Sequence, residues 1–177
     1  MARDQEAVAR FAAGEAAEID VPTYKPNALI WINKRFRADS AHAKALAIIL
    51  AHHNPVDILT GQQIDTAKSL AWTNSKEYHH FFPRDYLKSI GVSNSAANSL
   101  ANIIMLTAAS NNQISNRPPS DYLKDVETAA GGNLQHWLAS NLISEVAFRA
   151  ARENDYLSFL NARAETINRV VSQLGGW

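Results

Sequence analysis

The sequence predicts a mainly α-helical fold that contains one small two-stranded hairpin. Most of the chain carries apolar residues at helical spacing, and only residues 78–82 and 101–106 have the character of strands. The 177 residues, 46% of them hydrophobic, are enough for one substantial core. We therefore expect a single domain, with an N-terminal helical part at 1–75, a central core at 76–124 and a C-terminal helical part at 125–177.

The N-terminal part is expected to contain three helices and a turn. Residues 3–17 are rich in alanine and charged residues, with apolar positions at helical spacing. A second helix should begin after Ser40, which can cap it, and end before Pro55. Residues 57–65 include a Thr-Gly pair and predict a turn, and the aspartate at its end can cap a short helix through Trp72.

The central part is expected to fold in the order strand, strand, helix. Residues 78–82 are rich in aromatic side chains that suit a pleated surface, and Pro83 should end the strand. The apolar run at 101–106 lies between polar residues and is the expected partner strand. Residues 107–113 are mostly small and compatible with a helix.

Helices are predicted for the remainder of the chain. A helix over 119–129 begins with proline at a first-turn position, and a short helix covers 134–142. Residues 144–174 keep apolar side chains at helical spacing, with a break expected at Asn154 and Asp155.

The adjacent residues His79 and His80 carry the strongest functional signal. Neighbouring side chains on an extended strand point to opposite faces, so one ring can hold a cation while the other serves a substrate. A divalent ion can bind a phosphate oxygen and the leaving oxygen, and a neutral imidazole with a pKa of about 6.5 can take a proton from water. We interpret His79 as a metal ligand and His80 as the general base of phosphodiester hydrolysis.

These residues resemble the motif of the HNH, or His-Me finger, endonucleases, in which a β-hairpin and a helix clamp one divalent ion. The two histidines followed by Phe82 and Pro83 are similar to the paired residues of that family. The resemblance implies a ββα-metal motif in which Asn102 is the central asparagine, a catalytic residue that braces the hairpin and orients the base. It also implies that Asn111 is the third position and a metal ligand, with Asn112 as the register alternative.

The likeness extends to one branch of the family, the C-terminal nuclease domains of GmrSD-type modification-dependent restriction and phage-defence proteins. Residues 116–123 look like the segment after the metal helix of that branch, and residues 55–61 and 163–167 are also similar, so the likeness covers roughly 40–174. It implies a DNA substrate, a role in restriction-modification or antiviral defence, and a ParB-like nucleotide-hydrolysing partner domain or subunit. This chain lacks a glycine-rich phosphate loop of its own.

The chain departs from the branch at Phe81, where isoleucine is usual, and at Asn111, where histidine is usual. An amide oxygen suits hard ions, so the site should favour Mg²⁺ or Mn²⁺. The absence of cysteine excludes thiolate-held structural zinc and fits a cytoplasmic location. We expect no membrane association, because the longest apolar run, near 45–51, is too short to cross a bilayer.

Charge is uninformative in total but uneven along the chain. The 17 basic and 17 acidic residues cancel, whereas nucleic-acid-binding domains are usually basic. Residues 24–44 contain five basic residues against one acidic residue, and residues 76–124 contain five against three. Both segments could line a phosphate track. We predict nucleic-acid contacts from Arg84, Lys88 and Arg117; for Asn116 we predict a supporting role in its loop.

Two other functions remain open on the sequence. The asparagine at the third position and the zero net charge are compatible with a non-catalytic module that binds DNA or a protein through a degenerate finger. An RNA-directed nuclease could use the same finger. Calorimetry with Mn²⁺ and plasmid nicking separate the first from an enzyme, and RNA offered beside DNA separates the second.

Overall fold

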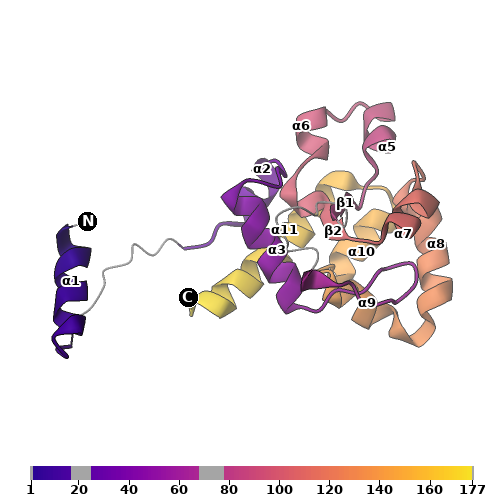
Figure 1. The fold of residues 1–177 in the computed structure, drawn as a ribbon. Helices are drawn as coiled ribbons and strands as arrows, with labels where there is room; N and C mark the ends of the chain where they lie inside the picture. Colours follow the sequence, from indigo (N-terminus) through magenta and orange to yellow (C-terminus); the bar gives the residue numbers. More distant parts are fainter. Residues whose placement is uncertain (1, 17–24, 68–77, 177) are drawn as a thin grey trace.

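The computed structural model of the protein describes residues 2–16, 25–67 and 78–176. The described part is mainly helical and contains one two-stranded antiparallel sheet, which confirms the predicted class (Figure 1). The helices are α1 Ala2–Ala12, α2 Ala28–Asn33, α3 Ala41–His52, α5 Arg84–Ser89, α6 Asn94–Ala97, α7 Ala108–Ile114, α8 Pro119–Ala130, α9 Leu134–Ser140, α10 Glu145–Arg152 and α11 Tyr156–Gly175. The strands are β1 Tyr78–His80 and β2 Ile103–Met105, and 3₁₀ turns form at η1 Leu100–Asn102 and η2 Gly131–Asn133. None of the helices in these ranges combines the length and apolarity that a membrane crossing requires.

Capping residues mark several helix boundaries where the sequence predicts them. The Ser40 hydroxyl accepts a hydrogen bond from the first turn of α3, and α3 ends at His52. Asp155 caps α11 and separates it from α10, which confirms the predicted break. Helix α1 ends earlier than expected, and α2, which Asn27 caps, was not predicted. The helix expected through Trp72 lies mostly outside the described residues.

The predicted turn at 57–65 packs closely against α9. Gly61 adopts a φ of +70°, a conformation that costs other residues strain, and a Cβ at this position would overlap the indole ring of Trp137. We expect Gly61→Ala to lower the free energy of unfolding by about 2 to 4 kcal/mol, measured by urea denaturation. Gly132→Ala is the matched control, because a Cβ there would meet open space. Equal stability of the two variants would contradict this account.

The two strands pair over three residues each, with a long connection between them. Tyr78 pairs with Met105, and the two histidines pair with the preceding two residues of β2. β1 ends two residues earlier than predicted, because Phe81 and Phe82 leave the strand and enter the core, where both are fully buried. The connection carries α5, α6 and η1, so the expected small hairpin is a short sheet with a helical excursion. Figure 1 shows α5 and α6 projecting from the strands on the side opposite α9.

An aromatic cluster anchors the end of β1. The Phe81 ring stacks on Phe159 of α11 with centroids 4.6 Å apart, and the Phe82 ring lies 5.0 Å from Tyr156 and 5.1 Å from Phe159. Burying a phenylalanine side chain contributes about 1.5 to 3 kcal/mol. The cluster therefore fixes the chain directly after the histidines against α11.

Three side chains from the C-terminal helices hold the main chain of the strand connection. The Tyr122 hydroxyl donates to the carbonyl of Phe81 at 2.7 Å, and the Tyr156 hydroxyl donates to Ala96 at 2.8 Å. The Arg163 guanidinium donates to the carbonyl of Ala101 at 2.9 Å. We call these three side chains the carbonyl clamps. They tie the segment between β1 and β2 to α8 and α11 at three points.

Arg163 is the most unusual of the carbonyl clamps, because it is a fully buried cationic side chain. Its second amino group donates to the carbonyl of Asn141 at 3.2 Å. Burial lowers the pKa of Arg163 to about 9, so the side chain remains charged at neutral pH. Main-chain carbonyl dipoles from two separate segments thus solvate this cation.

Candidate functional site

His79 and His80 lie on β1 at the edge of the core. Both are half-buried, and in the antiparallel register His79 lies opposite Ile104 while His80 lies opposite Ile103. As consecutive strand residues they project to opposite faces of the sheet. The two rings can therefore contact different partners.

His80 belongs to a hydrogen-bond network that the sequence did not predict. Its Nε2 lies 2.9 Å from the side-chain oxygen of Asn98, just after α6. The Asn98 amide group donates to the carbonyl and the side-chain oxygen of Asn94, at 2.8 and 2.9 Å. Arg84 donates to the same Asn94 side-chain oxygen at 3.1 Å. The strand connection thereby brings four polar side chains into one chain of hydrogen bonds.

The environment of His80 favours its neutral form. Burial lowers the pKa of His80 from its ordinary value, and electrostatic interactions with Arg84 and His79 act in the same direction. The hydrogen bond that His80 makes to the Asn98 side-chain oxygen raises the pKa, but the net direction is downward. The ring is therefore neutral at pH 7 and able to accept a proton.

Asn102 is fully buried and acts as a brace. Its side-chain oxygen accepts a hydrogen bond from the amide of Phe82 at 2.8 Å. Its amide group donates to the carbonyls of Phe82 and Ala97, at 3.1 and 2.9 Å. The side chain thus joins the two ends of the connection that carries α5 and α6. The family resemblance implied a bracing role for Asn102, and these bonds hold the loop that follows β1.

Helix α7 follows β2 directly and carries the predicted third position. Asn111 is half-buried on α7, and Asn112 is exposed. Within residues 2–16, 25–67 and 78–176, no hydrogen bond joins Asn111 to either histidine ring. The same ranges contain no group of three or more His, Cys, Asp or Glu side chains able to hold a metal ion. A metal at this site would accordingly depend on an imidazole and an amide oxygen.

Asp57 fixes the start of α7, a role that the predicted turn did not reveal. The carboxylate is fully buried and accepts hydrogen bonds from the amide and hydroxyl of Thr107, at 2.9 and 2.8 Å. It also accepts from the hydroxyl of Ser110 at 2.8 Å and from the amide of Leu59 at 2.9 Å. Thr107 is the N-cap of α7. One acidic side chain therefore determines where the helix that bears Asn111 begins.

The predicted nucleic-acid contacts differ in how much of their charge is available. Lys88 is exposed on α5, as is Arg84 at the start of the same helix. Arg117 is neutralised by Asp121 and Asp125, at 2.8 and 2.7 Å. These two carboxylates raise the pKa of Arg117. Asn116, the predicted loop support, is exposed beside this ion-pair cluster.

A basic segment at residues 34–37 runs beside the His80 network. The amide of Phe36 donates to the carbonyl of Asn98 at 2.7 Å, and Arg35 forms a β-bridge with Ser99. The Phe36 ring lies 5.3 Å from the ring of Tyr78, next to His79. Lys34, Arg35 and Arg37 are exposed. Residues 34–37, part of the basic segment predicted at 24–44, thus contact Asn98, the partner of His80.

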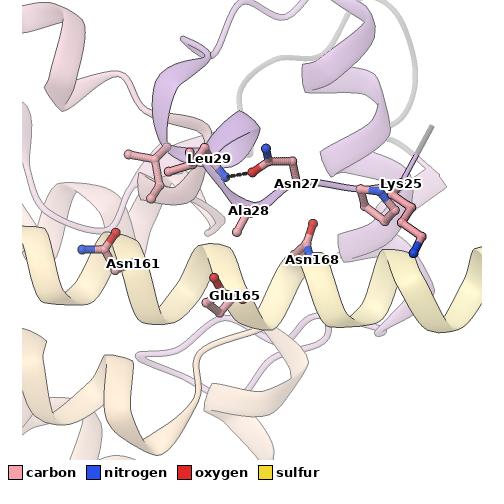
Figure 2. A pocket seen from close by; sticks show the side chains of 9 residues that line it. Lys25, Asn27, Ala28, Leu29, Asn161, Glu165 and Asn168 are labelled. Carbon is pink, nitrogen blue, oxygen red and sulfur yellow. Dashed lines mark hydrogen bonds between the residues drawn. The ribbon is translucent and has the colours of Figure 1, made fainter. Parts of the chain in front are cut away.

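A separate hollow of about 400 Å³ lies between the start of α2 and α11 (Figure 2). Its polar lining comes from Lys25, Asn27, Asn161, Glu165 and Asn168. Figure 2 shows the Asn27 oxygen engaged with the amide at the start of α2. None of the predicted site residues lines this hollow, so it does not belong to the candidate site.

Comparison with known proteins gives little functional information. No family model matches the chain. Over 105 residues the chain is 28% identical to an uncharacterized protein of Methanocaldococcus jannaschii. The match covers 54% of this chain and 18% of that protein, so the chain spans less than a fifth of the length of this curated relative. No solved structure matches. Function is therefore inferred from the residues of the site.

Proposed function

We propose that this protein is a divalent-metal-dependent endonuclease of the HNH type that hydrolyses phosphodiester bonds in DNA. The observation that carries the proposal is the environment of His80, a half-buried and neutral imidazole held by Asn98 beside a second histidine. A neutral, oriented imidazole is what general-base catalysis requires near pH 7. We also propose that the protein serves as the nuclease domain of a restriction or phage-defence system and acts with a ParB-like partner. This part of the proposal depends on the family resemblance.

The roles of the chain's own residues follow from their positions. His80 takes a proton from the attacking water, which lies in line with the departing 3′ oxygen. Asn102 keeps the loop after β1 in place and so preserves the direction of the His80 ring. When bound, Mg²⁺ or Mn²⁺ supplies charge stabilisation to the phosphate and the leaving oxygen.

The donor set proposed for the metal fits a hard ion that retains most of its water. His79 offers one imidazole nitrogen and Asn111 one amide oxygen, or Asn112 in the alternative register. Mg²⁺ commonly keeps several waters and binds proteins through only one or two side chains together with substrate phosphates. The start of α7, which Asp57 fixes, supports this pairing because it limits the movement of Asn111 relative to β2.

The exposed cations near the network support a nucleic-acid substrate. Lys34, Arg35 and Arg37 belong to the segment that bridges to Asn98 and Ser99, and Arg84 lies at the start of α5. Cationic side chains grouped beside a site of hydrolysis can position a phosphate backbone. Arg117 contributes less than the sequence suggested, because its charge is shared with two carboxylates.

Divalent-dependent plasmid nicking tests the proposed function. Purified protein should convert supercoiled plasmid to the open-circular form with Mg²⁺ or Mn²⁺, and EDTA should abolish the reaction because the phosphate charge is then unscreened. Calorimetry with Mn²⁺ should give a binding isotherm that His79→Ala removes. Normal nicking in EDTA would contradict the role of the metal. Cleavage of RNA but not DNA in parallel reactions would contradict the proposed DNA substrate and identify RNA as the substrate instead.

A non-catalytic DNA-binding module is the second candidate. It is favoured by the lack of a cluster of three or more His, Cys, Asp or Glu ligands in the described ranges, while the basic segment at 34–37 would still bind phosphate. This candidate predicts salt-dependent DNA binding, no Mn²⁺ isotherm and no nicking. The same two measurements therefore separate it from the nuclease.

A further inference from the structure

We infer that Asn98 is a positioning residue that fixes the tautomer of His80, with the proton on Nε2 and the lone pair on Nδ1. The assignment of Nδ1 as the proton-accepting atom of catalysis rests on the proposed function. The tautomer itself does not, since it follows from hydrogen bonds within the protein. Neither Asn98 nor Asn94 belongs to the motif that the two histidines and Asn102 resemble.

The orientation of the Asn98 amide is determined by a main-chain carbonyl. The carbonyl oxygen of Asn94 can only accept, and Asn98 Nδ2 lies 2.8 Å from it. The NH₂ group must therefore face Asn94, which turns the Asn98 side-chain oxygen toward His80 Nε2 at 2.9 Å. That oxygen has no proton to give, so His80 Nε2 must be the donor. A neutral ring with Nε2 protonated has its lone pair on Nδ1.

Arg84 supports the same orientation from the opposite end of the network. A guanidinium can only donate, and one of its amino groups lies 3.1 Å from the side-chain oxygen of Asn94. That oxygen then also accepts from Asn98 Nδ2 at 2.9 Å. The network contains hydrogen bonds from Arg84 to Asn94, from Asn98 to Asn94 and from His80 to Asn98. In each of them only one of the two groups can be the donor. This assigns Arg84 an anchoring role in addition to its predicted contact with nucleic acid.

The main chain holds Asn98 firmly enough for this purpose. The amide of Asn98 donates to the carbonyl of Asn94 at 3.3 Å, and its carbonyl accepts from the amide of Phe36 at 2.7 Å. The neighbouring residue is fixed as well, because the Ser99 hydroxyl donates to the carbonyl of Trp31 in α2 at 3.0 Å. Asn98 therefore offers His80 an acceptor whose position is set by α6 and by the segment from Trp31 to Phe36.

Nitrogen-15 NMR of the histidine rings tests the tautomer directly in the full chain. At about pH 8, above the ordinary histidine pKa of about 6.5, His80 should show a protonated Nε2, a lone-pair Nδ1 and a slowly exchanging Nε2 proton. Asn98→Leu should lose that slow exchange, because leucine offers the ring no acceptor. A protonated Nδ1 in the wild type, or an unchanged Nε2 proton in Asn98→Leu, would overturn the inference. The wild-type spectrum decides even if the leucine variant does not fold.

Nicking kinetics test whether the orientation matters for catalysis. We expect Asn98→Leu to lower kcat by about 10- to 100-fold with little change in KM, since a misdirected base loses reactive geometry. The control Asn133→Leu alters an exposed asparagine that makes no side-chain capping bond, and it should match the wild type. Wild-type kcat in folded Asn98→Leu would refute the positioning role. A wild-type protein that does not nick DNA would instead refute the proposed function, and the spectrum would still decide the tautomer.

Discussion

His80→Ala should reduce divalent-dependent nicking by about 10² to 10⁴-fold, the range that a general base contributes. The fold should survive, because His80 is half-buried and β1 is anchored by Phe81 and Phe82 rather than by the histidine ring. Initial rates of plasmid relaxation measure the loss, and circular dichroism with thermal melting verifies the fold. Full activity in the alanine variant would remove the base assignment.

The control for this variant is His136→Ala, which removes an exposed histidine on α9 and should leave the rate unchanged. The pH dependence adds an independent check. Because the pKa of His80 is lowered, the ring stays neutral to a lower pH than an ordinary histidine. The wild-type rate should therefore hold as the pH falls to about 6.5 and decline only below it. A decline centred above that value would be inconsistent with the environment of His80.

Asp57→Ala should lower the free energy of unfolding by about 3 to 5 kcal/mol, because it leaves several buried donors without an acceptor. The donors belong to Leu59, Thr107 and Ser110, and those of Thr107 and Ser110 stand at the start of α7. Urea denaturation measures the change. The nicking rate, measured where the variant is still folded, should also fall, because Asn111 lies on α7.

Two variants sharpen the test of Asp57. Asp57→Asn keeps the side-chain volume but turns an NH₂ group toward donors, so it should also destabilise the protein. Asp39→Ala removes an exposed acid whose contact with Arg37 spans 3.7 Å, and it should change stability by less than about 1 kcal/mol. If Asp57→Ala matched Asp39→Ala, the buried carboxylate would not be what fixes α7.

Elements with strong local signals could be predicted from the sequence. Ser40 and Asp155 stand directly before apolar helical patterns, and both cap helices in the structure. The proline at the start of α8 was an equally clear signal. The apolar run at 101–106 contains β2, but only Ile103–Met105 form the strand, because Ala101 and Asn102 belong to the 3₁₀ turn η1. In contrast, α5 and α6 have six and four residues, too few to display a helical period. They are held by tertiary contacts, which a single sequence does not reveal.

The candidate site divides in the same way. The two histidines and Asn102 stand out because their spacing resembles a known motif. Asn98 lies in a run of serine, asparagine and alanine residues that looks like an ordinary loop, and its role arises only when the chain returns to β1. Arg163 could not be recognised as a core residue, because arginine is rarely buried without a charged partner. Its two carbonyl acceptors come from segments 22 and 62 residues away.

The carbonyl clamps have a consequence for how the protein comes into being during translation. Tyr156 and Arg163 follow His80 by more than seventy positions. Both histidines are therefore synthesised well before the two side chains that hold the segment between β1 and β2. If the protein is the nuclease proposed above, hydrolytic activity is gained only when α11 packs against this segment. A ribosome-bound chain that ends before Tyr156 would contain both histidines but would lack the contacts from Tyr156 and Arg163 that hold the segment between β1 and β2.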